Sequence, residues 1–186
     1  MSINSLIESV SHDILNPFHN FEIAKEYERL NQTASAVSFY LRAAEYGVDN
    51  PAARDVVYAS LLRMSICFED QKDRSWTVSN CLLQALEFAP ERPEAYFLYA
   101  RFHERSQNWQ ECYTFASMGL QLALQVEPLP VDVEYPGIYG LEFEKAVSAW
   151  WIGRKDESQE IFERLLADSS VSDTYVGAIK YNMERL

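Results

Sequence analysis

Glycine and proline are sparse in this sequence, which contains six and seven of them among 186 residues. A β-sandwich or β-barrel needs turn-forming residues about every 8–12 positions, so this scarcity excludes a fold built mainly from strands. Cysteine is also scarce: Cys67, Cys81 and Cys112 are odd in number and lack the paired spacing of zinc ligands. We therefore expect no disulfide framework, no metal site and no cofactor, and we expect three buried, inert thiols in a reducing cytoplasm.

Long apolar runs are missing as well, and basic residues are fewer than acidic ones. No stretch approaches the ~18 consecutive apolar residues of a membrane-spanning helix, and the N-terminus lacks the basic start of a signal peptide. The chain has 16 Lys and Arg against 28 Asp and Glu, which leaves a net charge of −12. Such a surface repels phosphates and anionic lipids, so we expect neither nucleic acid nor a membrane as partner. The charge either keeps the protein soluble or attracts a basic partner.

Apolar residues recur at intervals of three and four along nearly the whole chain, and this spacing predicts amphipathic α-helices. Pro17 is expected to end the first helix, Gly47 to cap the third, and Pro51 and Pro93 to open helices in their first turns. Residues 126–137 contain three prolines and form the one long non-helical connection. The expected helices cover about residues 3–14, 20–30, 34–46, 51–68, 75–88, 93–105, 109–125, 138–152, 156–167 and 172–186.

A weak internal repeat runs through residues 20–167 as four helix pairs. Each copy places a small side chain where two helices would cross closely and large side chains where neighbouring pairs would meet. The small residues of the first helices are Ala24, Ser65, Ala100 and Ala146, those of the second helices are Ala36, Cys112 and Ser158, and the large residues are Tyr27, Tyr40, Phe68 and Phe162. No pair can bury its apolar face alone, so stacking must supply the core.

This pattern resembles a tetratricopeptide repeat (TPR) array. The resemblance implies an all-α fold, a right-handed α–α superhelix of about four degenerate TPR-like helix pairs with flanking N- and C-terminal helices. We expect one domain over residues 1–186, with an N-terminal helix at 1–16, the four pairs at 20–167, the Pro-rich insertion at 126–137 and a capping helix at 171–186.

A narrower resemblance lies in the second half. The strings Arg92–Tyr96, Tyr99–Phe102, Glu144–Val147 and Trp150–Ser158 are similar to the helical tail that follows the catalytic domain of some family 2 glycosyltransferases. The segment Phe21–Leu30 fits the same tail. In that family the sugar-nucleotide chemistry belongs to a separate α/β domain, which this chain lacks. The resemblance implies a tail or accessory domain that positions the enzyme or its acceptor.

Catalytic motifs are absent from the sequence. A glycosyltransferase needs a metal-binding Asp-x-Asp after a buried strand, and the nearest string, Asp132-Val133-Glu134, lies in a Pro-flanked loop. There is no Gly-rich phosphate loop and no G-x-S-x-G. His103 takes the place of a repeat aromatic, so we expect it to be packed or to line a groove. We therefore expect that the chain is not an enzyme. The alternative, that it is an enzyme in its own right, predicts that it binds a nucleotide sugar.

In TPR arrays the first helix of each pair lines the concave face, where a peptide or protein partner lies. Carried over one repeat at a time, the resemblance assigns the partner-binding residues Phe21, Lys25, Arg29, Leu62, Ile66, Phe97, Arg101, Arg105, Phe143, Val147, Trp150 and Trp151, with Glu69 at the end of the second repeat's series. The four cations among them either meet a carboxylate-bearing partner or pair locally with Glu22, Glu26, Glu28 and Glu104.

Trp150 and Trp151 are adjacent, so about 100° of helix rotation separates them and they cannot share a face. One is expected to pack in the core, and the other to approach the groove or a partner. The first hypothesis for function is a non-catalytic interaction module. The alternatives are a glycosyltransferase accessory and a self-assembling scaffold, a homo-oligomer whose exposed terminal aromatics pair with another copy.

Overall fold

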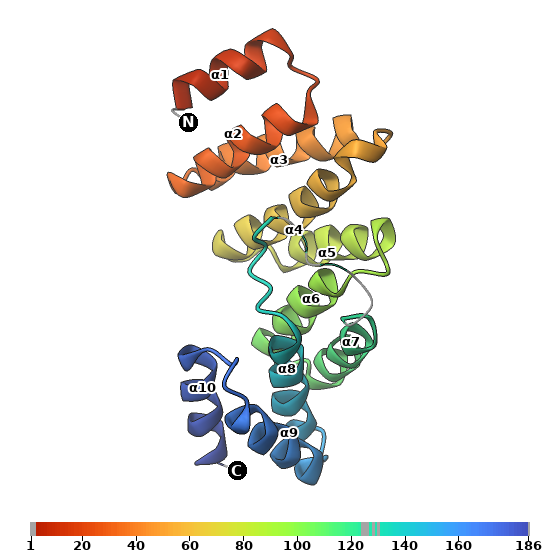
Figure 1. Cartoon of the computed structure of the whole chain (residues 1–186), viewed down its shortest axis with the longest axis vertical. Helices are drawn as coiled ribbons and strands as arrows, with labels where there is room; N and C mark the ends of the chain where they lie inside the picture. Colours follow the sequence, from red (N-terminus) through yellow and green to blue (C-terminus); the bar gives the residue numbers. More distant parts are fainter. Residues whose placement is uncertain (1–2, 124–126, 128, 130, 186) are drawn as a thin grey trace. The chain divides into compact units, whose positions relative to one another are not determined.

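The computed structural model describes residues 3–123, 127, 129 and 131–185, and all regular structure in these ranges is helical (Figure 1). The helices are α1 (Ile3–His12), α2 (Pro17–Arg29), α3 (Thr33–Gly47), the 3-10 turn η1 (Pro51–Ala53), α4 (Arg54–Asp70), α5 (Ser75–Phe88), α6 (Pro93–Arg105), α7 (Trp109–Leu122), α8 (Ile138–Trp151), α9 (Lys155–Ala167) and α10 (Asp173–Met183). None of the described helices is long and apolar enough to cross a membrane.

The chain forms two compact units. Unit 1 comprises Met1–Pro90 with Pro128–Val133, and unit 2 comprises Glu91–Glu127 with Glu134–Leu186. The single domain expected from the sequence stays a prediction. The predicted extension of the seventh helix to residue 125, and much of the Pro-rich insertion, fall on residues outside those described.

Unit 1 is a stack of helix pairs, in which α2 packs on α3, α3 on α4 and α4 on α5, while α2 also contacts α4. The prediction that Pro17 ends the first helix is wrong: α1 ends at His12 and Pro17 is the first residue of α2. The missing amide hydrogen of proline is not needed in a first helical turn. Asn16 completes this start, because its side chain accepts hydrogen bonds from the amides of Phe18, at 3.0 Å, and His19, at 3.2 Å.

Gly47 was predicted to cap the C-terminus of the third helix, and this is also wrong. It is the last residue of α3, its φ is not positive, and the following Val48 is in the right-handed helical region. A Cβ at Gly47 would lie 2.6 Å from Cγ2 of Val57 and 3.2 Å from Cβ of Pro17. Glycine is therefore required here by the close approach of α2 and the start of α4 to the end of α3.

The small residues of the repeat are buried, as the sequence pattern predicts for helices that pack closely. The seven small side chains are all buried, and the large side chains of Tyr40 and Phe162 are fully buried beside them. Burial of this kind removes apolar surface from water at about 25 cal/mol per Å², and the stack depends on it because each pair alone leaves a face exposed.

Unit 2 repeats the arrangement with α6 on α7, α7 on α8 and α8 on α9, and α6 also contacts α8. The predicted capping helix is α10, which packs against α9 and α8. Its Tyr175 meets Tyr139 and Phe143 edge-on, each with 5.1 Å between ring centroids, and its Ile179 is fully buried. The final helix thus covers the apolar surface that the last pair would otherwise expose.

Gly47→Ala should lower the free energy of unfolding by about 1–3 kcal/mol, because the new methyl group overlaps Val57 and Pro17. The matched control is Gly177→Ala in α10, where an added Cβ meets nothing within 4 Å. This control should be neutral or stabilising by up to about 1 kcal/mol, since alanine restricts the unfolded chain and favours a helix. Urea denaturation measures both. Equal effects of the two substitutions would contradict the packing role of Gly47.

Candidate partner-binding site

Unit 1 contains a polar cavity of about 590 Å³. Its walls come from the end of α2, the turn between α2 and α3, one face of α4 and the segment at residues 131 and 132. The lining residues are Lys25, Glu28, Arg29, Asn31, Thr33, Arg63, Asp70, Val131 and Asp132. The first helices of consecutive pairs, α2 and α4, therefore contribute most of the site, as expected for the partner-binding face of a TPR-like stack.

Glu28 organises the base of the cavity. Arg63 donates to it through Nε, at 3.1 Å from Oε2, and through Nη2 to Oε1, while the hydroxyl of Tyr40 donates to Oε2 at 2.6 Å. The fork geometry of the arginine suits a carboxylate, so the pair joins α2 to α4 in a defined orientation. Burial raises the pKa of Tyr40, with the hydrogen bond to Glu28 adding to the effect. The tyrosine therefore remains a hydrogen-bond donor throughout the physiological range.

Lys25 and Arg29 lie at the cavity's solvent side and pair within their own helix. Nζ of Lys25 is 2.7 Å from Glu22, and Arg29 donates to Glu26 at 2.9 and 2.7 Å. The hydrogen bond from Arg29 lowers the pKa of Glu26. The local-pairing interpretation of these two cations is thus correct for the free protein. Exposed pairs of this kind contribute little to stability, so they exchange readily for another carboxylate.

Arg63 and Asp70 were not predicted as site residues. Leu62 and Ile66 on the same helix were predicted instead, and both are buried in the core. Arg63 and Asp70 are seven residues apart and therefore lie on one face of α4, next to the face of Leu62. A polar stripe at that spacing was the available signal, but the degenerate repeat did not show which stripe faces the cavity.

The twelve predicted contact residues divide into five that are buried and seven that are at least partly accessible. Phe21, Leu62, Ile66, Phe97 and Val147 are buried and hold helices together. Phe143 and Trp150 are half-buried, Phe143 against Phe162 and Tyr175, and Trp150 beneath Nζ of Lys155 at 4.2 Å. The binding role of all twelve residues stays a prediction. The accessible ones are Lys25, Arg29, Arg101, Arg105, Phe143, Trp150 and Trp151.

Trp151 is 60% exposed and lies parallel to Trp109, with 5.1 Å between ring centroids and 13° between planes. Trp109 packs in turn on the apolar core of unit 2. The two adjacent tryptophans are therefore placed differently: Trp150 is half-buried, and Trp151 presents its ring to solvent.

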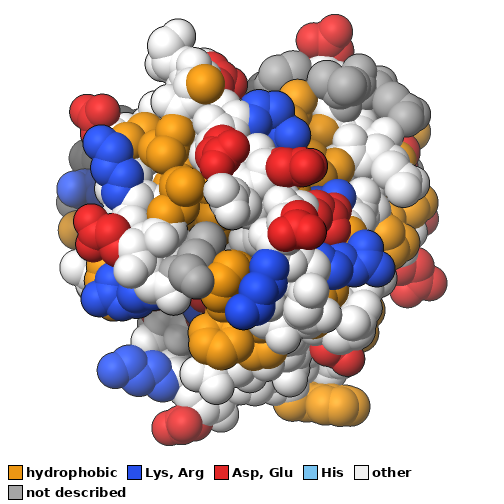
Figure 2. Space-filling view, turned by 90° about the horizontal axis from the view of Figure 1, so that it is seen from below, with side chains coloured by type: hydrophobic (Ala, Val, Ile, Leu, Met, Phe, Trp, Pro, Cys, Tyr) orange, Lys and Arg blue, Asp and Glu red, His pale blue; other side chains and the backbone are white. Residues whose placement is uncertain are grey.

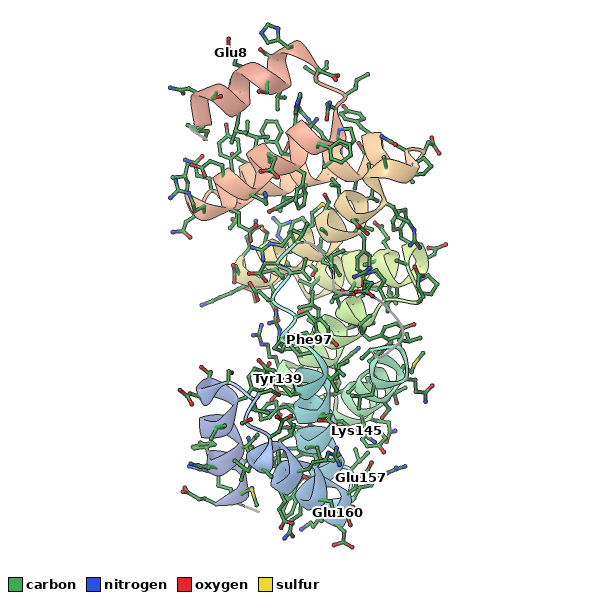
Figure 3. All side chains as sticks on the ribbon, viewed as in Figure 1. Glu8, Phe97, Tyr139, Lys145, Glu157 and Glu160 are labelled. Atoms are coloured by element: carbon green, nitrogen blue, oxygen red, sulfur yellow. The ribbon has the colours of Figure 1, made fainter. Side chains whose placement is uncertain are left out.

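The charged residues of unit 2 largely engage one another. Arg101 donates through both terminal nitrogens to Glu134, at 3.2 Å, a partner that was not considered from the sequence. Lys145 on α8 pairs with Glu157 on α9 at 2.8 Å, and the labelled side chains can be followed in Figure 3. Glu157 also accepts from the hydroxyl of Tyr113, at 2.9 Å. Acidic, basic and hydrophobic side chains are interspersed on the face drawn in Figure 2.

Glu144 is a buried carboxyl group of unit 2. It is only 4% exposed, and its Oε2 has no hydrogen-bond partner. Burial, together with the nearby charge of Glu104 and against the opposing effect of Arg101 and Arg105, raises the pKa of Glu144 to about 8. A neutral carboxyl is favoured because an ionised one would be desolvated. Glu144 therefore enters the core of the folded protein as an acid that keeps its proton near neutral pH.

The three thiols are packed away from solvent, and His103 is partly buried. The three cysteines are free and buried, as expected. Burial raises the pKa of Cys67 to about 12 and that of Cys81 to about 11, so both remain weakly nucleophilic thiols. His103 lies between Tyr99 and Phe115, and burial lowers its pKa. Within residues 3–123, 127, 129 and 131–185, no three His, Cys, Asp or Glu side chains are grouped to hold a metal ion.

The string Asp132-Val133-Glu134, the nearest approach to a metal motif, is divided by the structure. Asp132 is exposed and lines the unit 1 cavity, Val133 is buried, and Glu134 belongs to unit 2, where it accepts from Arg101. The two carboxylates thus have different surroundings and do not form one site.

Comparisons with known proteins agree with this architecture. No family model matches the sequence, and no curated protein matches it. Among solved structures, the MamA protein is 12% identical with a TM-score of 0.62, over 89% of this chain and 79% of MamA. A kinesin light chain of Podosopora anserina with nearly identical TPR-like repeats is 16% identical with a TM-score of 0.57, over 80% of this chain and 72% of that one. YrrB, a TPR protein with an unusual peptide-binding site, is 10% identical with a TM-score of 0.50 over all of both chains.

At these identities the likeness concerns the fold. The chain has a TPR-like, all-helical fold, and the fold class predicted from the repeat is confirmed. The comparisons do not extend to a glycosyltransferase tail.

Glu144→Gln should change how stability depends on pH. Below about pH 4.5 the carboxyl is protonated in both the folded and the unfolded chain. Between that value and about pH 8 the unfolded chain releases a proton that the folded chain retains, so the free energy of unfolding falls as pH rises. The neutral amide removes this loss.

Urea denaturation at several pH values is the measurement. Relative to the unmodified chain, the Glu144→Gln variant should gain about 2–4 kcal/mol between pH 5 and pH 8. Glu142→Gln is the control, since Glu142 lies on the same helix but pairs with Arg164 at the surface, at 2.7 Å. Parallel pH profiles for the Glu144→Gln variant and the unmodified chain would show that Glu144 is ionised in the fold.

Proposed function

We propose that this chain is a non-catalytic protein-interaction module that binds a peptide or protein partner on the face formed by α2 and α4. The observation that carries the proposal is the cavity of unit 1, with Lys25 and Arg29 at its solvent side and Arg63 fixed at its base. Helix pairs of this fold present such a face without a conformational change, which limits the entropy cost of binding.

Several features support binding rather than catalysis. The buried thiols with raised pKa values and the packed His103 are poorly placed as nucleophile and base. The cavity instead offers side chains that recognise charge and hydrogen bonds: lysine, arginine, asparagine and threonine. We place the module in the cytoplasm and expect no nucleic acid or membrane partner, given the net charge of −12.

A glycosyltransferase accessory is the second candidate, and the sequence strings of residues 92–158 favour it. Apart from residues 128–133, these residues belong to unit 2, whose exposed Trp151 offers a large aromatic contact surface. Co-purification with a glycosyltransferase, lost on Trp151→Ala, would support this candidate. Association of two copies through the same ring would instead support the homo-oligomer and would appear in light scattering as a doubled mass.

Lys25→Ala combined with Arg29→Ala should weaken partner binding about tenfold, because two cations at the edge of the site are removed. The full chain serves as bait in an extract of its native host, with recovered proteins quantified by mass spectrometry. Both lysine and arginine are exposed and paired only along α2, so the fold should be retained.

The matched control is Arg42→Ala, an exposed arginine of unit 1 that stacks on Phe39 outside the cavity. It should recover the same partners in the same amounts as the unmodified chain. Recovery of every partner by the Lys25/Arg29 variant at unmodified levels would contradict the proposed site.

A further inference from the structure

The helix α10 is the most lightly attached helix of unit 2. Ile179 is its one buried residue, whereas α6, α7, α8 and α9 each bury at least three. Gly177 lies inside α10, where an added Cβ would meet nothing within 4 Å, and glycine in a helix interior lowers helix stability. A helix with few buried contacts opens at a lower free energy than the core beside it. We therefore expect α10 to open while the rest of unit 2 stays folded.

The face that α10 covers on α8 is aromatic and has a buried carboxyl group beside it. Tyr175 of α10 contacts Tyr139 and Phe143 edge-on; α10 lies beside α8 in Figure 1, and Tyr139 is labelled in Figure 3. The next residue of α8 is Glu144, whose Oε2 is buried without a hydrogen-bond partner. Burial and then the nearby charge of Glu144 are the largest effects that raise the pKa of Tyr175, to about 12. The hydroxyl of Tyr175 therefore lies near the carboxyl of Glu144.

The groups around Glu144 come from each helix that packs against α8. Glu104 on α6 opposes ionisation of Glu144, whereas Arg101 and Arg105 on the same helix favour it. A carboxylate formed here would thus have cations close by, but it is shielded from solvent while α10 is closed. The other titratable or charged groups on this side are Cys112 on α7, whose thiol donates to the backbone carbonyl of Glu144, Tyr139 and Tyr175, Glu134, which pairs with Arg101, and Glu157 and Arg164 on α9, which pair with Lys145 and Glu142.

Opening of α10 and ionisation of Glu144 are linked through one proton. A solvated glutamic acid ionises near pH 4.5, while burial holds the proton of Glu144 until about pH 8. Below the lower value, the closed and open forms both keep the proton, so opening does not depend on pH. Between the two values only the open form releases it, so the opening equilibrium rises by up to about tenfold per pH unit. Stability of the closed form is therefore complete in acid and falls as the pH rises toward 8.

We infer that α10 is a proton-controlled cover of the aromatic face of α8, closed while Glu144 holds its proton and released as this carboxyl ionises. Release exposes Tyr139 and Phe143, and Phe143 is among the residues predicted to contact a partner. Arg101 and Arg105 then lie beside the ionised Glu144. The inference concerns unit 2 alone and is independent of the proposed function, which rests on the cavity of unit 1.

Hydrogen–deuterium exchange of the full chain, read by mass spectrometry of its peptides at about pH 5.5, 6.5 and 7.5, tests the inference. Each exchange rate is divided by that of a free peptide of residues 173–183, DTYVGAIKYNM, or 109–122, WQECYTFASMGLQL, at the same pH, which removes the intrinsic pH dependence of exchange. Protection of α10 should be lower than that of α7 at each pH. It should fall at least about tenfold from about pH 5.5 to about pH 7.5.

Three variants assign the effect. Glu144→Gln keeps the shape of the side chain without the proton, so the protection of α10 should change by less than about twofold over the same range. Glu142→Gln should behave as the unmodified chain, because Glu142 pairs with Arg164 at the surface. Ile179→Ala should lower the protection of α10 at least about tenfold at every pH, because it removes the one buried anchor of the helix. If circular dichroism shows that Glu144→Gln is unfolded, Glu144→Met replaces it with the same expected result.

Three results overturn the inference. The first is protection of α10 in the unmodified chain that does not change with pH. The second is an equal fall of protection with pH in the unmodified chain and in the folded Glu144 variant. The third is equal protection of α10 and α7, which would mean that α10 opens only when unit 2 unfolds as a whole. Partner recovery by the Lys25/Arg29 variant is measured separately and does not depend on any of these outcomes.

Discussion

Close approach of helices at small side chains is the constraint on which the structure depends. Ala24, Ala36 and Ala100 have no exposed surface, and Gly47 has no room for even one added carbon atom. Helices that approach this closely bring their long neighbouring side chains into contact with the next pair, which is how Tyr40 and Phe162 become fully buried. The same approach decides which faces remain for polar side chains, and therefore where a binding surface can form.

The ion pair between Glu28 and Arg63 connects this packing to the cavity. It joins the first helices of two consecutive pairs and receives a third contact from the hydroxyl of Tyr40 on α3. Desolvation of a partly buried pair costs free energy, and the additional hydrogen bond compensates only when the three groups keep their geometry. The pair therefore specifies the register of α2 against α4, and with it the positions of Lys25 and Arg29 relative to Arg63.

The fold follows from the sequence to a large extent because helical periodicity and small-residue spacing are local signals. The helices at 93–105 and 75–88 end where the pattern predicts. The predictions for Pro17 and Gly47 were wrong because each residue type occurs in two settings. A proline follows the end of one helix or begins the next, and here the side chain of Asn16 caps the helix that Pro17 begins. A glycine adopts a positive φ or occupies a narrow space, and here the space is narrowed by Val57, which lies on another helix.

The candidate site was less predictable, because it depends on contacts between residues far apart in the chain. Leu62 and Arg63 are adjacent on α4, and one degenerate repeat does not show which of them points to the core. The position of Asp132 on the wall of the cavity, and the pairing of Arg101 with Glu134, are produced by a connection that has no regular structure in its described residues. The helical repeat of the sequence does not predict the path of such a connection.

The distance along the chain between the cavity's helical wall and Asp132 has a consequence for synthesis. The residues of α2, α3 and α4 leave the ribosome before Asp132 is made, and at about 5–20 residues per second the 62 positions from Asp70 to Asp132 take several seconds. During that interval the nascent helix pairs can meet one another without the acidic segment. The helical wall thus has time to assemble from near neighbours in sequence before the chain's own carboxylate is made.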